Sequence, residues 1–228
     1  MTEFVPCVMA TLGQSATRNT CARTQHPKGF TLAASLTPAR LTLAAWLCVA
    51  IAVLEVPILG MELFLAAASD SADGPASVAA HAGSSILAAI SSTICAVLFT
   101  TVRVFLEERF GFFKASSPIR LIVNAEGVLA VGSVLELFMP GYTLSHALVL
   151  LLFLFTCVVR IVAAIKMLSL PDDWGGLLKP YCIAEIVFGV CCATVVLLPI
   201  GLIAIMISDI LLAIVFFRAA DNLSAQVR

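Results

Sequence analysis

Apolar segments long enough to cross a lipid bilayer recur along this chain, and they limit what it can fold into more than any other feature. A bilayer core about 30 Å thick requires roughly 20 apolar residues in a helix. Because the bilayer interior offers no water to backbone polar groups, such segments must form helices. The sequence therefore predicts an all-α, polytopic integral membrane protein. Its six expected transmembrane helices cover residues 41–68, 77–106, 119–139, 144–168, 180–198 and 200–217.

The composition agrees with this prediction. Hydrophobic residues make up 61% of the 228 residues and charged residues 12%, whereas a soluble domain has about 45–50% apolar and roughly 25% charged residues. The apolar excess is spread along the chain, so it is not a single anchor on a soluble domain. The net charge of −1 argues against a nucleic-acid partner. The lipid bilayer is the expected partner, and a homo-oligomer is a further expectation.

Motifs that would carry a cofactor or catalysis do not occur in the sequence. The chain has eight cysteines, six of them inside apolar segments where thiols act as small packing residues. Their spacing contains no CxxC pair or Cys/His pattern typical of a metal site. A Ser/His/Asp set, an HExxH motif, a Walker loop and a GxGxxG turn are also lacking. We therefore expect no metal, no cofactor and no enzymatic activity.

The ends of the chain differ from the apolar region between them. Residues 1–40 carry four basic residues against one acid, Glu3, and are rich in Ser and Thr. This composition is typical of an organelle transit peptide and equally of a disordered cytosolic tail, so both interpretations stay open. Residues 41–220 are the predicted six-helix transmembrane domain, and residues 221–228 are a short C-terminal tail.

The basic residues predict the orientation. With six spans, all 13 Lys and Arg fall on the side of the two termini. The positive-inside rule makes that side cytoplasmic, or its equivalent in an organelle. Aromatic residues near the ends of the spans are expected to anchor the chain at the two interfaces. These are Trp46, Phe112, Phe113, Trp174 and Tyr181 on the inner side and Tyr142 on the outer side.

The six segments form three predicted hairpins, and the last two resemble each other. At an offset of 59 residues, Glu126 aligns with Glu185 and Pro140 with Pro199. In both, an alanine precedes the glutamate and the proline follows it by 14 residues. Pro199 is expected in a tight turn, because a single helix over residues 180–217 would be about 57 Å long, nearly twice the bilayer core. A repeated two-helix unit is common in duplicated membrane proteins.

These hairpins resemble the HdeD family of acid-resistance membrane proteins. The resemblance rests on residues 184–189 (Ala-Glu-Ile-Val-Phe-Gly), on Leu198-Pro199, and on the apolar run to Ile214. Residues 119–167 show the same outline, and the whole resemblance covers about residues 41–220. The first hairpin departs from the pattern in its longer outer loop. The resemblance implies a non-enzymatic role in acid or stress tolerance or membrane homeostasis, with no established chemistry.

Charged residues inside the apolar helices are the candidate functional residues. Each costs about 2.5–3.5 kcal/mol at a helix centre on insertion scales. Arg160 is at a depth similar to that of Glu126 and Glu185, so we expect it to pair with one or both. Glu136 can reach the outer interface, and several other carboxyls are expected to be protonated or hydrated. The predicted polar membrane core consists of Glu55, Glu62, Glu126, Glu185, Asp209 and Arg160.

This polar core has two interpretations. One is structural, with interhelical hydrogen bonds and one Glu–Arg pair that fix the packing. The other is a proton- or cation-responsive path, lined by Glu55 and Glu62 on one helix face, as in a small transporter or channel. A membrane enzyme or assembly factor is a third class of function. His81 and His146, near the outer helix ends, either sense acidity or are ordinary interface side chains.

Close helix contacts are expected at small residues. Gly127, Gly132, and Gly189 with Ala193 are candidates, because the lack of a bulky side chain lets two membrane helices approach each other.

The six-span topology makes a prediction that labelling can test. Single cysteines replacing Ser71 and Ala225 should react with a membrane-impermeant reagent from opposite sides, because an odd number of spans separates them. The measurement is labelling of intact and permeabilised vesicles. Labelling of both positions from the same side would contradict the topology.

Overall fold

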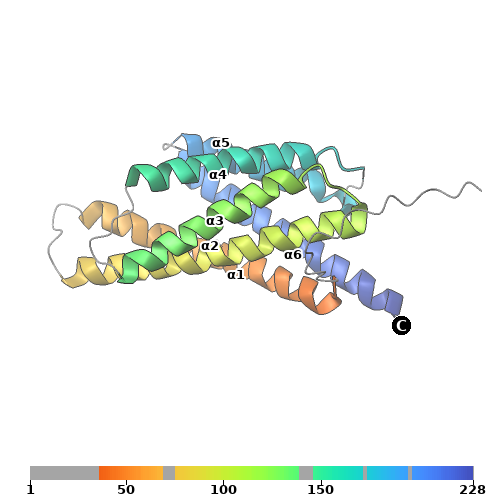
Figure 1. The fold of residues 1–228 in the computed structure, drawn as a ribbon, viewed down its shortest axis with the longest axis horizontal. Coiled ribbons are helices and arrows are strands. Elements are labelled where there is room, and N and C mark those ends of the chain that lie inside the picture. Colours follow the sequence, from red (N-terminus) through yellow and green to blue (C-terminus); the bar gives the residue numbers. More distant parts are fainter. Residues whose placement is uncertain (1–35, 69–74, 139–145, 172–173, 195–196, 228) are drawn as a thin grey trace, which may run out of the picture. The chain divides into compact units, whose positions relative to one another are not determined.

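The fold, seen in a computed structural model, consists of long α-helices joined by short links (Figure 1). The structure describes residues 36–68, 75–138, 146–171, 174–194 and 197–227. No β-strand occurs within these ranges, which confirms the all-α prediction. The elements are α1 (Pro38–Ala68), α2 (Pro75–Phe110), α3 (Ser116–Phe138), α4 (His146–Met167), the short 3-10 helix η2 (Trp174–Gly176), α5 (Leu178–Ala193) and α6 (Leu198–Val227).

Among the described residues, four of these helices could cross a membrane. Each contains a stretch with the length and apolar composition to span a bilayer, which confirms the prediction of membrane helices to that extent. The stretches are Pro38–Pro57 in α1, Ala82–Phe110 in α2, Ser116–Phe138 in α3 and Pro199–Ala225 in α6.

The helices close into a ring. Each of the six α-helices packs against the next one along the chain, and α6 also packs against α1. The first and last helices of the domain are therefore neighbours, although they are farthest apart in sequence. Because every helix has a partner on both sides, the ring has an interior toward which all six helices can direct a side chain.

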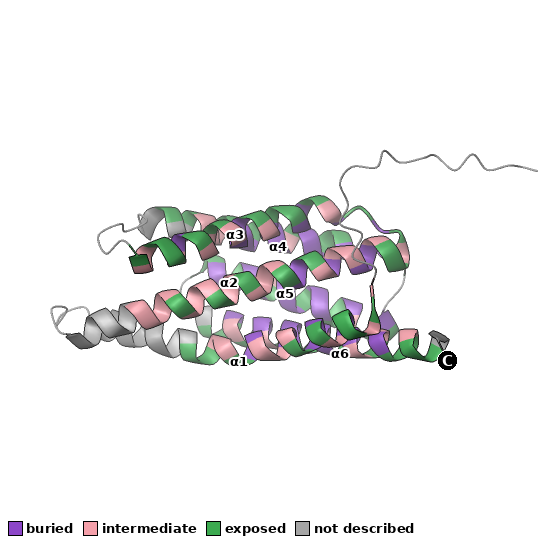
Figure 2. Ribbon diagram, turned by 60° about the horizontal axis from the view of Figure 1, so that its bottom comes forward, coloured by how far each residue is buried: buried purple, intermediate pink, exposed green. Residues whose placement is uncertain are grey.

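The outer surface of the ring is aliphatic, and the buried residues lie on the faces that the helices turn toward one another (Figure 2). Each helix exposes large apolar side chains, for example Val53, Val97, Val128, Val158, Ile183 and Ile203. A soluble protein rarely exposes so many aliphatic side chains together, whereas lipid tails solvate them well. The apolar outer surface is thus consistent with an integral membrane protein.

An aromatic cluster packs the end of the ring where α2 and α6 end. The ring of Phe105 meets those of Phe110, Trp174 and Phe216 edge-on, with centroids 5.4, 6.0 and 5.8 Å away. The ring of Trp174 in turn lies 5.9 Å from that of Tyr181. Such pairs add about 0.5–1.5 kcal/mol to the burial of their area.

This cluster corrects part of the interface-anchor prediction. Trp46 and Phe113 are exposed as expected, but Phe112, Trp174 and Tyr181 are buried in the protein. The ring of Trp174 packs against Phe105 and the ring of Tyr181 packs against Trp174. Phe112 belongs to the same buried apolar core, so all three side chains contact protein and not lipid headgroups. Tyr142 lies outside the described residues.

Pro199 does not form the last hairpin turn, which corrects the sequence prediction. Helix α5 ends at Ala193, α6 begins at Leu198, and the Leu197 N–H donates to the Thr194 carbonyl at 2.9 Å. Pro199 instead lies in the first turn of α6. Proline is tolerated there because the first backbone N–H groups of a helix have no intrahelical acceptor. Helix α6 also continues to Val227, through most of the expected C-terminal tail.

Two glycines allow close helix contacts. A Cβ added at Gly189 of α5 would lie 2.6 Å from Ile161 Cγ1 and 3.1 Å from the Cys157 carbonyl oxygen, both on α4. A Cβ at Gly201 of α6 would lie 3.1 Å from the Cβ of Cys191 on α5. Around Gly127, by contrast, no atom lies within 4 Å of the corresponding position. Of the glycines singled out in the sequence, Gly189 therefore lies at a close contact and Gly127 does not.

Replacing Gly189 by alanine should destabilise the protein, and the same change at Gly127 should not. The new methyl group would press on Ile161 and on backbone that cannot move aside, and overpacking typically costs about 1–3 kcal/mol. Gly127→Ala is the matched control, because it gains helix propensity of roughly 1 kcal/mol without a clash. Thermal unfolding in detergent measures both. Equal unfolding temperatures for the two variants would contradict the close α4–α5 contact.

Candidate functional site

A cluster of charged and polar side chains occupies the interior of the ring. Every helix contributes at least one group to it. We define the buried cluster as Glu55 of α1, Ser92 of α2, Glu126 of α3, Arg160 of α4, Glu185 of α5, and Ser208 with Asp209 of α6. Five of its members are buried, and Glu55 and Ser92 are half-buried. The ring thus brings together residues that are separated by up to 154 positions in the sequence, from Glu55 to Asp209.

The ion pair between Arg160 and Glu185 lies at the heart of this cluster. Arg160 Nε is 3.0 Å from Glu185 Oε2, and a terminal guanidinium nitrogen donates a long hydrogen bond of 3.5 Å to Oε1. The Nε–H makes no hydrogen bond of good geometry within the described residues, so its attraction to the carboxylate is electrostatic. Of the two partners expected from the sequence, Glu185 is the one that forms the ion pair.

Ser208 completes the contacts of Glu185. Its hydroxyl donates to Glu185 Oε1 at 2.6 Å, and the serine is fully buried. A hydrogen bond this short to a carboxylate is typical of the charge-assisted kind. Helices α4, α5 and α6 are therefore joined through the two oxygens of one side chain. Ser208 is not among the residues predicted from the sequence, although its place next to Asp209 in an apolar helix was a signal for it.

Two aromatic rings flank the guanidinium. The Cζ atom of Arg160 lies 4.9 Å from the ring centroid of Phe99 on α2 and 4.9 Å from that of Phe188 on α5. Cation–π contacts of this kind are worth about 2 kcal/mol or more when desolvated. The rings also exclude lipid from the charge. Neither phenylalanine could be singled out from the sequence, because both belong to ordinary apolar runs.

The remaining acids of the buried cluster surround this pair without a base of their own. Ser92 is within hydrogen-bonding reach of Glu126. Asp209 is close enough to Glu55, Arg160 and Glu185 to interact electrostatically with each. One oxygen of Glu55 is buried and has no hydrogen-bond partner in the part of the chain that is described. Four carboxyl groups therefore share one guanidinium.

The other predicted residues lie outside the cluster or outside the described side chains. Glu136 accepts a hydrogen bond of 3.4 Å from Ser85, between α3 and α2. The backbones of Glu62, His81 and His146 belong to α1, α2 and α4, but their side chains are not among those described. The proposed pairing of Glu55 with Glu62 and the pH-sensing role of the histidines therefore stay predictions.

The described residues contain no group of three or more His, Cys, Asp or Glu side chains arranged to hold a metal ion. Six cysteines lie in the described helices, and all six are free thiols. Chemically, the buried cluster can bind and release protons and can hold helices together.

Comparison with known proteins adds no assignment. No family model matches the chain, and neither a curated protein nor a solved structure has a significant match to it.

The ion pair predicts a specific coupling. Arg160→Leu would leave Glu185 buried without its counter-charge, and breaking a buried pair from one side typically costs about 3–5 kcal/mol. Adding Glu185→Gln should restore part of this loss, because a neutral amide needs no counter-charge. Glu126→Gln, the matched control at the equivalent position of the preceding hairpin, should restore less. A double-mutant cycle on unfolding in detergent measures both couplings, and equal couplings would contradict the specific pair.

Proposed function

We propose that the chain is a six-span integral membrane protein of HdeD-like type that contributes to acid or stress tolerance without catalysing a reaction. The observation that carries this proposal is the excess of acids in the buried cluster, four carboxyls around one guanidinium. An unpaired carboxylate is costly to bury, and its neutral acid form costs much less. The cluster is therefore a place where the protein can take up protons when the surroundings become acidic.

The six-span topology is part of the proposal, with both termini on the cytoplasmic or equivalent side. Helix α4 has 22 residues, about 33 Å at 1.5 Å per residue, which is enough for a bilayer core. Helix α5 has 16 residues, about 24 Å, and is the shortest of the six. Its place in the ring between α4 and α6 supports its being a span, since both neighbours contact it along the buried cluster. Local thinning of the bilayer accommodates a short span at modest cost.

The arrangement around Arg160 explains how such a cluster can gain protons without losing the fold. The Arg160–Glu185 pair is fixed by Ser208 and by the flanking phenylalanines. Protonation of Glu126, Asp209 or Glu55 removes negative charge from the interior without breaking that pair. A structural pair and a set of proton-accepting neighbours thus coexist in one cluster, which agrees with both interpretations of the polar core.

A transporter or channel is the alternative, and one observation favours it. Polar contacts continue along the α2–α3 interface away from the ion pair, from Glu126 with Ser92 to Glu136 with Ser85. Ser85 and Ser92 are seven residues apart, two turns of α2 on one helix face. This row of hydroxyl and carboxyl groups is the kind of lining that a proton path requires.

The proposal predicts that acid survival depends on the cluster. Cells that produce the Glu126→Gln/Asp209→Asn variant should survive acid exposure no better than cells without the protein. The matched control, Glu108→Gln/Asp221→Asn, changes two exposed acids on α2 and α6 and should protect like the unchanged chain. Equal survival with both variants would contradict the proposal.

Proton flux into liposomes that contain the purified protein distinguishes a transporter or channel from the proposed role in acid tolerance. No flux above that of empty liposomes is expected for the proposed role. A flux that Glu126→Gln and Glu185→Gln abolish would instead identify a transporter.

A further inference from the structure

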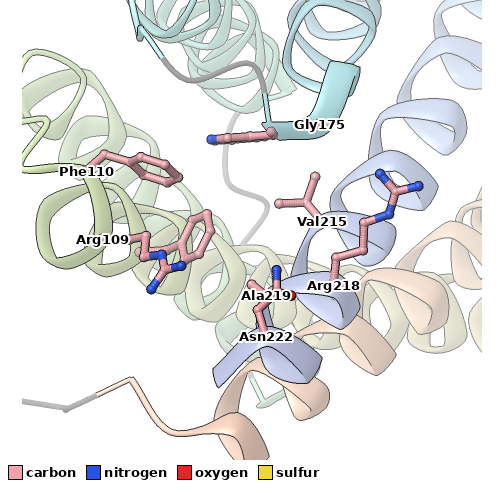
Figure 3. Close-up of a pocket in the computed structure, with 9 residues that line it drawn as sticks. Arg109, Phe110, Gly175, Val215, Arg218, Ala219 and Asn222 are labelled. Atoms are coloured by element: carbon pink, nitrogen blue, oxygen red, sulfur yellow. The ribbon is translucent and has the colours of Figure 1, made fainter. Parts of the chain in front are cut away.

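A second feature of the molecule lies apart from the buried cluster, at the ring end where α2 and α6 end. It is a cavity of about 270 Å³ between α2, α6 and η2 (Figure 3). This volume is close to the roughly 300 Å³ at which small-molecule pockets begin. Its polar lining comes from Arg109, Arg218 and Asn222, and its aromatic lining from Phe105, Phe110 and Trp174.

Within the described residues, the arginines that line the cavity have no acidic partner. Arg109 belongs to the last turn of α2, and Arg218 belongs to α6, on the other side of the cavity (Figure 3). Neither arginine forms an ion pair with a carboxylate among the residues that the structure describes. No acidic residue lines the cavity within those ranges. Asp172 and Asp173, which precede Trp174 in the sequence, lie outside the described residues.

The turn that closes the cavity is held in an unusual conformation. Trp174 has a φ of +50°, and Gly175 follows with a φ of +66°. A non-glycine residue in the left-handed region costs about 1–3 kcal/mol, and such strain persists where the surroundings fix it. Here the rings of Phe105 and Tyr181 hold the Trp174 side chain. Gly175 has no Cβ, and a Cβ there would lie 3.4 Å from Arg218 Nη1. The guanidinium therefore lies directly against the turn.

We propose that this cavity binds a phosphate-bearing anion beside the Asn222 amide. The two exposed guanidinium groups lie on opposite sides of the cavity and point away from each other in Figure 3, so each must turn inward to contact the ligand. Guanidinium groups match phosphate oxygens with parallel hydrogen bonds, and Asn222 supplies a neutral donor beside them. The aromatic wall gives the ligand an apolar side. The volume fits a headgroup-sized ligand, which is either the headgroup of an anionic phospholipid or a soluble phosphate compound. The inference does not depend on the acid-tolerance role.

The test measures thermal unfolding of the purified full-length protein in detergent. Four additions are compared at equal ionic strength, namely phosphatidylglycerol, phosphatidylcholine, inorganic phosphate and chloride. Stabilisation by phosphatidylglycerol but not by phosphatidylcholine or inorganic phosphate identifies a lipid headgroup. Stabilisation by inorganic phosphate identifies the phosphate group itself as sufficient. Either result supports the proposal, whereas no stabilisation beyond that by chloride overturns it.

Variants locate the binding. Arg109→Gln and Arg218→Gln should each weaken the apparent affinity about tenfold, the loss of one charge-assisted hydrogen bond. The matched control is Arg120→Gln, which removes an exposed charge on α3 outside the cavity. Ala219→Leu fills the cavity and keeps every charge, so it should abolish binding. If Arg218→Gln does not fold, Arg109→Gln and Ala219→Leu decide the question. Equal affinities for Arg109→Gln, Ala219→Leu and Arg120→Gln would show binding to surface charge and overturn the site.

Discussion

The ion pair between Arg160 and Glu185 is the interaction on which the rest of the structure depends. A guanidinium stays charged in proteins, so a helix that buries one among apolar side chains must surround it with compensating groups. The ring does this with a carboxylate 3.0 Å away and a phenylalanine on each side. Ser208 then orients the carboxylate from a third helix. Helices α2, α4, α5 and α6 each contribute a side chain to this ion pair or its immediate surroundings.

The same constraint explains the distribution of polarity in the molecule. A few polar side chains are buried together within a mostly apolar interior, while the outward faces carry many valines and isoleucines. Buried polar groups in a membrane protein mark either helix association or a path for ions and protons. Here one residue pair serves association, and three further acids, Glu55, Glu126 and Asp209, have no base of their own in the described cluster. Helix association through one ion pair therefore does not account for the surplus of acids.

The sequence predicts correctly those features of the fold that depend on a single segment of the chain. Apolar length predicts the helices because the cost of unpaired backbone groups in lipid leaves no other structure. The bounds of α1 to α4 agree with the prediction to within about four residues. The error at Pro199 arose because proline is found both in turns between helices and in the first turn of a helix.

The residues around Arg160 depend on how each helix is rotated and on which helices meet. Depth alone left Glu126 and Glu185 as equals, and nothing local distinguishes Phe99 or Phe188 from other apolar residues. Trp174 was misplaced for the same reason, since its burial depends on a link folding back onto Phe105.

The closed ring has a consequence for how the protein is made. Ribosomes add roughly 5–20 residues per second, and Glu185 follows Arg160 by 25 positions. The counter-charge is therefore synthesised about 1–5 s after the arginine, so the exposed charge has a short lifetime during insertion. Ser208, Asp209 and the contact between α6 and α1 come last. Until then the growing bundle is an open arc, and the side that α6 will cover has no neighbour. The final helix closes the arc through its contacts with α5 and α1.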